Sequence, residues 1–532
     1  MFASGETLLF GGGDGFTVDD ECRRRVVEDG IDAKNLQGAL RSLAACREPA
    51  CAHFSGRQTV FPENRFSRRA EKRFSAPAHE PSRHGHSIAV RISVLGTGYL
   101  GATHAACLAA CGHQVVGIDS NPARVERLAT GRAPFQEPGL DRLLTQGVRS
   151  GKLLFSTDYA DASQAEVHFV CVGTPQSESS HAADLSALWS ALAQLAPLLD
   201  GPSLVVGKST VPVGTAAAAR DYVRRIAPGG NAVELAWNPE FLREGHAVED
   251  SLRPERLVFG VESNEADLML REVYAPVITA GVPCVRTDLA TAELAKAAAN
   301  VMLAARISLV NLFAEVCEAA DADVGDLTTI LGYDARIGSR FLTPGVGYGG
   351  GCLPKDTRAF LARAQELGVG EPAAILREID VINLRQRART VELAVSLLEG
   401  VVTGANITVL GAAFKAGSDD VRDSPALDIA SRLHRLGARV RVSDPAALRN
   451  ARRAEPALEY DEDSISACRD AELVMVLTDW PDFQSIDPVA LLDVVAAPRA
   501  IDGRLFLDPD KWRAAGWELH ALGRRSPNRP LG

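Results

Sequence analysis

The sequence predicts an α/β protein in which two parallel-sheet domains are joined by a long central helical segment. Short apolar segments, typical of buried strands, alternate with helical segments from residue 89 to about residue 290. An Ala-rich helical stretch then interrupts the alternation, which starts again near residue 400. Alternation of strands and helices favours parallel sheets covered by helices on both faces.

The expected strands of the first domain, residues 89–290, read AVRISVLG, QVVGIDS, VHFVCVG, SLVVGKST and RLVFG. The middle of the chain, residues 291–399, is expected to form three helices, at 291–316, 357–366 and 373–398. The last domain, residues 400–525, returns to strands in NITVLGAAF, ARVRVSDP and ELVMVLTDW, with ALDIASRLHRLG as a helix, and a short tail follows at 526–532.

Residues 1–88 differ from the rest of the chain, because they are rich in Arg and interrupted by Gly and Pro. We expect a disordered extension without function, with one short helical run at 33–46, and a regulatory segment is the alternative. Since Met1 is the only Met before Met269, a natural start at a non-Met codon such as Val90 is a further hypothesis. A full-length intact mass in protein from the natural host would reject it.

Composition excludes several classes of protein. The chain has 532 residues and a formal net charge of −11, which argues against a nucleic-acid partner because such partners need a basic face. No stretch approaches the roughly 20 apolar residues that span a bilayer, and no signal-peptide pattern is present, so no membrane partner is expected. The ten Cys lack CxxC or His-paired spacing, which favours reduced thiols in the cytoplasm and no metal site.

The first expected strand runs into the glycine motif GTGYLG at residues 96–101, and the next strand ends in Asp119. In this context the motif predicts a Rossmann-type dinucleotide site. Gly96 permits the tight turn, Gly98 lets the backbone approach the pyrophosphate, and Gly101 lets helix and strand pack closely. Asp119 would bind the adenine ribose and repel a 2′-phosphate, so NAD is preferred over NADP. The alternative is a glycine-rich turn that binds no cofactor.

The last domain begins with VLGAAF, so it is Rossmann-like but lacks this fingerprint, and a different nucleotide is expected there. A second candidate site is the loop FLTPGVGYGGGCLPKD, in which five Gly occupy the eight residues before Cys352. Lys355 and Asp356 follow, and a nearby Lys would favour the nucleophilic thiolate. The alternative is a buried, inert Cys, which is how we interpret Cys107 and Cys111 on the first Rossmann helix.

Two polar clusters occur where core residues would be expected. Glu240 and Glu244, in NPEFLREG, share a face if that segment is helical. Glu293, Lys296 and Asn300, in TAELAKAAAN, share a face of the long helix. Taken in isolation, each cluster is better explained by structure than by catalysis.

Together these segments resemble the family of UDP-glucose 6-dehydrogenases and GDP-mannose 6-dehydrogenases, from about Val90 to about Leu507. The motifs VCVGTP, KSTVPVGT, NPEFLREG, TAELAKAAAN, GYDARIG, GVGYGGGCLPKD, FKAGSDDVRDSP and DGR occur in the family's order. KSTVPVGT and DARIG resemble the UDP-glucose branch. Gly351 departs from the pattern, since many relatives carry Ser there, and we expect it to change loop flexibility more than chemistry.

The resemblance implies a four-electron oxidation of UDP-glucose to UDP-glucuronate. The C6 alcohol would lose a hydride to NAD⁺, and Cys352 would add to the resulting aldehyde as a thiohemiacetal. A second NAD⁺ would take a second hydride and leave a thioester, which water would hydrolyse to the acid. The thiol would retain the aldehyde, and hydrolysis would make the oxidation irreversible in practice.

The resemblance also implies roles for individual residues. Lys296 and Asn300 would stabilise the developing oxyanion, and Asp356 would act as a base or position one. Glu240 and Thr210 would orient the hydrolytic water. The positions that match the family's catalytic residues are Cys352, Lys296, Asn300, Asp356, Glu240 and Thr210. Those that match its NAD-binding residues are Gly96, Gly98, Tyr99, Leu100, Gly101, Asp119, Arg124, Thr174, Glu244, Lys355 and Arg422.

The UDP would lie between the last domain and the glycine-rich loop. The positions that match substrate-binding residues are Phe241, Leu242, Arg243, Arg336, Tyr348, Gly349, Lys415 and Arg504. The family dimerises through its central helices, so a homodimer or higher homo-oligomer is implied, with Arg336 reaching the substrate of the partner subunit.

Three alternatives stay open at this point. Within the family, the substrate can be GDP-mannose or UDP-N-acetylmannosamine. A two-domain β-hydroxy acid dehydrogenase also joins a Rossmann domain to a long helix, but its chemistry needs no thiol and releases one NADH. A non-catalytic NAD-binding regulatory protein would keep the glycine motif, but it has no need of Cys352 and its polar neighbours.

Overall fold

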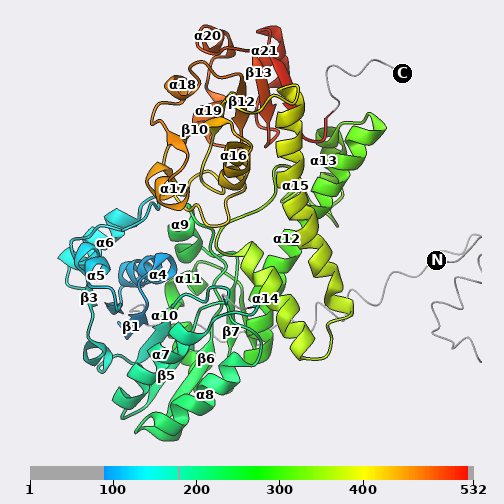
Figure 1. The fold of residues 1–532 in the computed structure, drawn as a ribbon. Helices are drawn as coiled ribbons and strands as arrows, with labels where there is room; N and C mark the ends of the chain where they lie inside the picture. The colour runs from blue at the N-terminus through cyan, green and yellow to red at the C-terminus, as the bar shows by residue number, and fades with distance from the viewer. Residues whose placement is uncertain (1–88, 178–179, 525–532) are drawn as a thin grey trace, which may run out of the picture. The chain divides into compact units, whose positions relative to one another are not determined.

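The computed structural model describes residues 89–177 and 180–524, and it contains two separate, mainly parallel sheets joined by long helices (Figure 1). This architecture confirms the predicted fold class. The expectations for residues 1–88, including the helical run at 33–46, and for the tail at 526–532 lie outside the described residues.

The first sheet has eight strands in the order β3-β2-β1-β4-β5-β6-β7-β8. Their bounds are β1 Arg91–Leu95, β2 Gln114–Ile118, β3 Leu153–Ser156, β4 Val167–Val170, β5 Ser203–Gly207, β6 Val233–Trp237, β7 Leu257–Gly260 and β8 Cys284–Thr287. All neighbours are parallel except β6 and β7, which meet in one antiparallel bridge. β6 and β7 can pair in antiparallel fashion because the segment between them forms a loop and one short helix, and not the long crossover helix that connects parallel neighbours.

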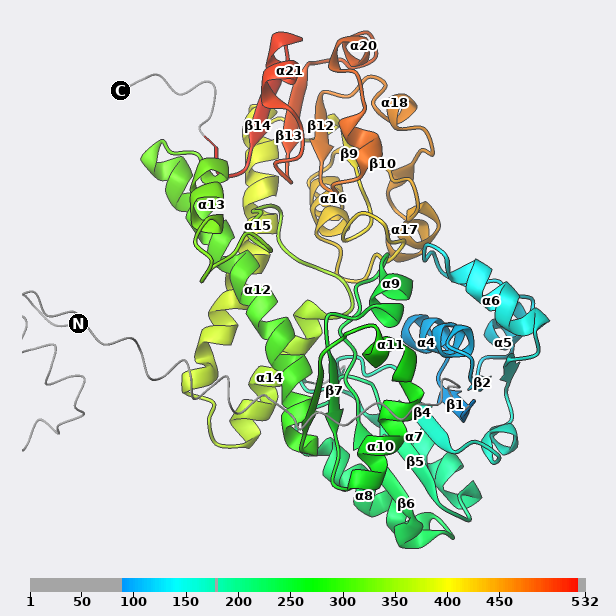
Figure 2. The ribbon, with the colours of Figure 1, turned by 180° about the vertical axis from the view of Figure 1, so that it is seen from behind.

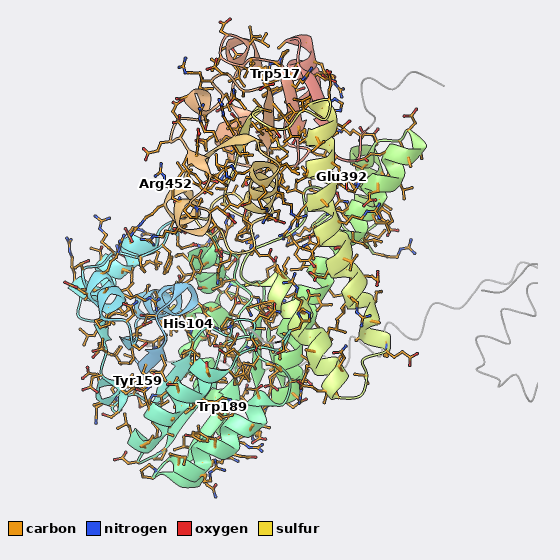
Figure 3. All side chains as sticks on the ribbon, in the orientation of Figure 1. His104, Tyr159, Trp189, Glu392, Arg452 and Trp517 are labelled. Carbon is orange, nitrogen blue, oxygen red and sulfur yellow. The ribbon has the colours of Figure 1, made fainter. Side chains whose placement is uncertain are left out.

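Side chains of this sheet alternate between two cores, one on each face. Phe169 of β4 packs into one core with helix α4 (Tyr99–Ala110), and Val170 packs into the other with α7 (Ser186–Leu195) and α8 (Thr215–Ile226). His104 on α4, labelled in Figure 3, lies in the first domain. Its ring is edge-on to that of Phe169, with 4.6 Å between ring centroids. The remaining helices of this domain are α5 Pro122–Ala129, α6 Leu140–Arg149, α9 Ala247–Leu252, α10 Asn264–Val273 and α11 Ala275–Thr279.

The central segment consists of α12 Leu289–Ala320, α13 Val324–Gly332, α14 Leu353–Glu366 and α15 Ile375–Leu397. Helices α12 and α15 pack side by side, as both views show (Figures 1 and 2). Helix α14 begins four residues before its predicted start, because Pro354 suits a first helical turn. Helix α13 was not anticipated.

Helix α12 corrects the expectation that no stretch approaches a membrane span. Its 32 residues include an 18-residue window with a hydropathy of 1.5, so by length and composition alone it is long and apolar enough to cross a membrane. Core helices pass the same test, and here Glu293, Lys296 and Asn300 are buried against other protein segments.

The second sheet repeats the strand order of the first six strands, as β11-β10-β9-β12-β13-β14, and all of its pairs are parallel. Asp444 follows its second strand, as Asp119 does in the first sheet. Here, however, Asp444 Oδ2 accepts hydrogen bonds from Ala412 N at 2.7 Å and Ala413 N at 3.0 Å. The carboxylate thus binds its own turn, as expected for a domain without the dinucleotide motif. Its elements are β9 Asn406–Leu410, α16 Pro425–Arg435, β10 Arg439–Ser443, α17 Leu448–Ala454, β11 Glu459–Tyr460, α18 Ser464–Ala467, β12 Leu473–Val476, α19 Pro481–Gln484, α20 Pro488–Leu492, β13 Arg499–Asp502, α21 Pro509–Ala514 and β14 Glu518–Ala521.

Candidate active site

The glycine turn between β1 and α4 has the backbone geometry that the motif predicts. Gly96 has a φ of +84°, in the left-handed region that favours glycine. A Cβ on Gly101 would lie 1.8 Å from the carbonyl oxygen of Gly96, so only glycine lets helix and turn pack this closely. A Cβ on Gly98 would meet no atom within 4 Å, which leaves open space over the helix N-terminus. A pyrophosphate fits there, because free N–H groups attract anions.

Asp119 lies beside the same turn, directly after β2. Its Oδ2 accepts hydrogen bonds from the Arg124 guanidinium at 2.8 Å and from Thr97 N at 2.7 Å, and its Oδ1 accepts from Asn121 N at 3.0 Å. Burial raises the pKa of Asp119, but these hydrogen bonds outweigh burial and hold the pKa below its usual value. The structure therefore brings together Asp119, as an anion, and Arg124 at the expected adenosine end.

A buried carboxylate, Glu137, joins the glycine motif to the NPEFLREG loop. The Tyr99 hydroxyl donates a hydrogen bond to Glu137, and Gly245 N donates to the same carboxylate at 2.9 Å. Val248 N donates to its other oxygen at 3.2 Å. Sequence reasoning missed Glu137. The one signal was an acidic residue before Pro-Gly in FQEPGL, which is too weak to interpret alone.

Two polar pairs form the centre of the site. Lys296 Nζ on α12 lies 3.0 Å from Glu240 Oε1, which belongs to the loop after β6. Asn300 Nδ2, one turn further along α12, donates to Asp356 Oδ2 at 2.6 Å. Lys355 Nζ donates to the other oxygen of Asp356 at 2.6 Å. Five side chains from three separate segments of the chain thus meet, and the contacts between segments do not follow from sequence spacing alone.

Lys296 remains a cation in this buried setting. Burial lowers its pKa, but Glu240, Cys352 and Asp356 raise it, and the net shift is upward. A fixed ammonium group in a water-poor site is well suited to stabilise a negative charge that develops on a substrate oxygen.

Cys352 is the residue directly before α14, and it is accessible to solvent. The protein around it still removes much of the water, and this desolvation, with Glu240 and Asp356, outweighs Lys296 and Lys355 and raises the thiol pKa to about 11. Lys355 does lower the thiol pKa and so favours the thiolate, as expected, but desolvation and the two carboxylates outweigh its effect in the resting site. The Lys355 ammonium is also paired with Asp356.

Thr210 and Thr174 line a cavity of about 460 Å³ together with Lys355 and Asp356. Thr174 Oγ1 donates to the carbonyl oxygen of Thr210 at 2.7 Å, which fixes the loop after β5. The other walls are largely apolar and include Val211, Pro212, Leu294, Ala297 and Phe360. Such a cavity can accept a flat ring beside the Asp356 carboxylate.

Glu244 and Arg422 join the first domain to the last. Their side chains form an ion pair at 3.1 Å, and Arg422 also pairs with Asp420 at 2.6 Å. Burial, assisted by Asp420, raises the pKa of Glu244 to about 7 against the opposing charges of Arg422 and Lys415. Both residues were expected near the reacting end of NAD, and the structure places them in contact.

The glycines before Cys352 allow the loop to pack on the last domain. A Cβ on Gly349 would lie 2.2 Å from the carbonyl oxygen of Asp423. A Cβ on Gly351 would lie 2.2 Å from the Cζ atom of Arg422. The departure at Gly351 therefore has a packing consequence beyond flexibility, since it makes room for the Arg422 guanidinium.

Arg504 and Lys415, the expected substrate residues of the last domain, lie near this loop. Tyr348, which is part of the loop, is instead buried. Arg504 Nε donates to the carbonyl of Leu477 at 2.8 Å, and Lys415 Nζ lies 5.5 Å from the Phe414 ring centroid. Tyr348 is only 5% exposed and packs in the core between α12 and α15. Its hydroxyl has no hydrogen-bond partner within the described part of the chain, so the side chain is turned away from solvent.

The NPEFLREG loop positions the remaining candidates differently. Leu242 N donates to Glu240 Oε2 at 2.7 Å, and the Arg256 guanidinium lies 3.8 Å from the Phe241 ring centroid. Lys296 Nζ also lies 5.7 Å from the Phe241 ring centroid, so both Phe241 and Leu242 sit next to the Glu240–Lys296 pair.

Two arginines are engaged elsewhere. Arg243 forms an ion pair with Asp250 at 2.7 Å, so its charge is already matched. Arg336 lies outside the cluster, since its side chain is 89% exposed and pairs with Asp334 at 2.6 Å.

Sequence reasoning also missed Lys208, a buried cation directly after β5. Its Nζ donates to Asn238 Oδ1 at 3.0 Å and lies 3.3 Å from the Tyr274 hydroxyl. Burial lowers its pKa to about 8. Asn238 begins the loop that carries Glu240, so the hydrogen bond from Lys208 helps to hold the start of that loop in place. A Lys at the end of an apolar strand in KSTVPVGT was the available signal.

Within residues 89–177 and 180–524, every cysteine is free, and no group of three or more His, Cys, Asp and Glu side chains can hold a metal ion. Cys107 is buried in the core, where packing was expected.

A dinucleotide-binding turn beside a cluster of carboxylates, ammonium groups and a thiol defines the class of the protein as a dehydrogenase. Residues 90–278 match the NAD binding domain of the UDP-glucose/GDP-mannose dehydrogenase family, residues 290–402 its central domain, and residues 408–509 its UDP binding domain. The chain belongs to the UDP-glucose/GDP-mannose dehydrogenase family, and NAD is its cofactor.

Individual relatives agree with this assignment. The chain is 37% identical to the UDP-glucose 6-dehydrogenase TuaD of Bacillus subtilis over 436 residues, which cover 82% of this chain and 93% of the relative. It is 37% identical to the UDP-glucose 6-dehydrogenase of Rhizobium meliloti, with 82% and 100% covered. A solved UDP-glucose dehydrogenase from Pyrobaculum islandicum is 35% identical, with a TM-score of 0.77 over 83% of this chain and 99% of that chain.

Proposed function

We propose that the protein oxidises UDP-glucose to UDP-glucuronate with two NAD⁺ and one water, through a covalent intermediate on Cys352. The observation that carries the proposal is the position of this thiol. It precedes α14 and experiences the charges of Lys296, Asp356, Glu240 and Lys355. A thiol in such a cluster can hold an aldehyde while a second oxidation takes place. The names of the relatives and the UDP-glucose-type motifs support the choice of sugar.

The cofactor would be held along the first domain. The turn at Gly96, Gly98 and Gly101 would bind the pyrophosphate, with Tyr99 and Leu100 in its first helical turn. Asp119 and Arg124 would hold the adenosine, and Thr174, Glu244, Lys355 and Arg422 would lie near the reacting end. When bound, NAD⁺ supplies the hydride acceptor for both oxidations.

The chain's own residues would then manage protons and charge. Lys296, which stays protonated, and Asn300 would stabilise the oxyanion at C6. Asp356 would position the base, since both of its oxygens already accept hydrogen bonds from Asn300 and Lys355. Because the Cys352 thiol holds its proton at rest, its addition to the aldehyde carbon must transfer that proton to an acceptor in the cluster.

The last step would be hydrolysis of the Cys352 thioester. Glu240 and Thr210 would orient the water that attacks the acyl carbon, and the C–S bond would break to release the carboxylate and restore the thiol. The UDP would lie against Phe241, Leu242, Gly349, Lys415 and Arg504. Tyr348 would take part by holding the loop in place, since its ring is buried and its backbone N–H and carbonyl are hydrogen-bonded to Asn383.

We further propose that the enzyme works in the cytoplasm as a homodimer or higher homo-oligomer. The exposed position of Arg336 supports a role for this residue in the site of a second subunit. We also propose that the chain divides into three domains, with limits at residues 89–290, 291–399 and 400–525.

UDP-N-acetylmannosamine is a second candidate substrate. A solved UDP-D-ManNAc dehydrogenase from Pyrococcus horikoshii is 28% identical, with a TM-score of 0.73 over 82% of this chain and 99% of that chain. GDP-mannose is the remaining alternative within the family.

The proposal is tested by counting NADH released per sugar consumed, with each of the three nucleotide sugars and NAD⁺. Two NADH per UDP-glucose is the expected result. One NADH per sugar indicates a simple dehydrogenase, and no NADH with any nucleotide sugar contradicts the proposal. Cys352→Ser should slow turnover drastically while NAD⁺ binding persists, and near-normal turnover would remove Cys352 from the mechanism.

A further inference from the structure

The loop that carries Thr210 lies between β5 and α8 and has no regular secondary structure of its own. It ends at Gly214, whose φ of +97° is in the left-handed region. Helix α8 begins at the next residue, and no side chain from its own N-cap accepts a hydrogen bond from its first turn. The first N–H groups of a helix need partners, so this helix start requires an acceptor from elsewhere.

Glu293 of α12 supplies that acceptor. Its Oε2 accepts a hydrogen bond from Gly214 N at 2.8 Å, and its Oε1 accepts one from Ala216 N at 2.6 Å. The side chain is buried, with 2% of its surface exposed. Hydrogen bonds to an ionised carboxylate are among the stronger ones in proteins. Burial outweighs them here and raises the pKa of Glu293 to about 7, so the carboxylate form is complete above neutral pH. The loop is therefore fastened to α12 at its downstream end.

Other contacts hold the rest of the same loop. Arg363 Nε of α14 donates to the carbonyl oxygen of Val213 at 2.9 Å, and Thr174 Oγ1 donates to that of Thr210 at 2.7 Å. Glu293 and Arg363 thus tie the loop to the two helices that carry the polar cluster. Glu293 lies one helical turn before Lys296, on the same face of α12.

We propose that Glu293 is a positioning residue, which fixes the Thr210 loop against α12 so that Thr210 stays aligned with Lys296 and Asp356. This inference rests on the proposed function for its kinetic consequence. In that mechanism Thr210 orients water for thioester hydrolysis, so a loosened loop slows the last step more than the binding of either ligand.

The experiment compares Glu293→Gln with the wild type and with Asp267→Asn. Gln keeps the size of the side chain but turns one acceptor into a donor that faces a backbone N–H. Asp267 of the first domain is another buried carboxylate, and its ion pairs are with Arg271 and Arg286, outside the loop. It serves as the control for the loss of a buried charge.

In Glu293→Gln we expect kcat to fall at least about tenfold, while the Kd for NAD⁺ and the KM for UDP-glucose change less than about twofold. A rapid burst of NADH should precede slow turnover, because the acyl-enzyme accumulates. Asp267→Asn should show no burst. An unchanged kcat, or equal losses in kcat and in ligand affinity, would overturn the proposal.

Hydrogen exchange tests the positioning independently of any substrate. The amides of Gly214 and Ala216 should exchange at least about tenfold faster in Glu293→Gln, and those of α12 should not. If wild-type protein shows no activity on UDP-glucose, the proposed function fails but this measurement still decides the positioning. Unchanged exchange at both amides would overturn it.

Discussion

At the scale of single residues, Cys352 shows how its surroundings determine the chemistry of a thiol. Its sequence neighbours suggested an activated thiolate, because Lys355 lies three residues away. In the folded protein, desolvation and the carboxylates of Glu240 and Asp356 prevail and raise its pKa to about 11. A protonated resting thiol is protected from oxidation until substrate and cofactor bind, since the thiolate is the reactive form.

This pKa predicts how alkylation of Cys352 depends on pH. A raised pKa means that the thiolate is scarce at neutral pH, so the iodoacetamide rate should rise about tenfold per pH unit from pH 7 to 10. Lys296→Met should slow the reaction at each pH, because Lys296 lowers the thiol pKa. Lys511→Met, on the distant α21, is the control.

The rate is measured by peptide mass spectrometry, since other free thiols are present. A rate that levels off near pH 8 would show that Cys352 is an activated thiolate at rest, contrary to this prediction.

At this same scale, the sequence predicted which residues belong to the site better than it predicted their partners. Cys352, Lys296, Asn300 and Asp356 were all candidates, and the structure brings them together. Their pairing, and the support from Glu137, depends on which loops meet in space. Such long-range contacts leave no local periodicity or spacing in the sequence.

At the scale of elements, the turn between β1 and α4 was the most predictable part of the molecule. Each glycine has a separate physical requirement, and the motif's context was enough to assign it. The start of α14 was less predictable, because the preceding glycines hide the position at which helical geometry begins. Cys352 occupies that boundary, so the thiol sits at the first turn of the helix.

The glycine turn predicts opposite outcomes for two similar substitutions. Gly101→Ala should destabilise the folded protein by about 1–3 kcal/mol or more, because its Cβ would overlap the Gly96 carbonyl. Gly98→Ala should leave stability nearly unchanged, since a Cβ there meets no atom within 4 Å, but it should weaken NAD⁺ binding.

Urea unfolding and NAD⁺ titration of both variants check the pair. Equal stability of the two variants, or normal NAD⁺ affinity in Gly98→Ala, would contradict the assigned roles.

At the scale of the whole molecule, both sheets follow the same strand order through six strands, and alternation along the sequence predicted their class. The antiparallel bridge between β6 and β7 was not predictable, because the sequence between them does not show whether it forms a short connection or a long crossover helix. For helix α12, composition alone is misleading. The helix satisfies the criterion for a membrane span, although Lys296 and Asn300 on it are buried within the protein.

The outer face of α12 predicts self-association. Its exposed apolar side chains recur at helical spacing and include Met302, Leu309, Leu312 and Val316. A second copy that covers this face would remove it from water. Light scattering should therefore give at least twice the chain mass of 56.6 kDa.

The double variant Met302→Glu/Leu309→Glu should give a monomer with reduced UDP-glucose turnover, because Arg336 would lose its partner site. Val489→Glu, on the exposed surface of α20, is the control and should remain associated. A monomeric wild type at micromolar concentration would contradict the dimer.

The central claim is that Cys352 carries the sugar covalently between the two oxidations. Glu240→Gln should retain both hydride transfers but hydrolyse the thioester slowly. Intact-mass analysis after incubation with UDP-glucose and NAD⁺ should then show one UDP-glucuronyl group per chain. Digestion should place it on the Cys352 peptide, and it should be released by hydroxylamine and absent from Cys352→Ser. Two NADH per sugar with no adduct on Cys352, in rapid-quench samples of this variant, would contradict the claim.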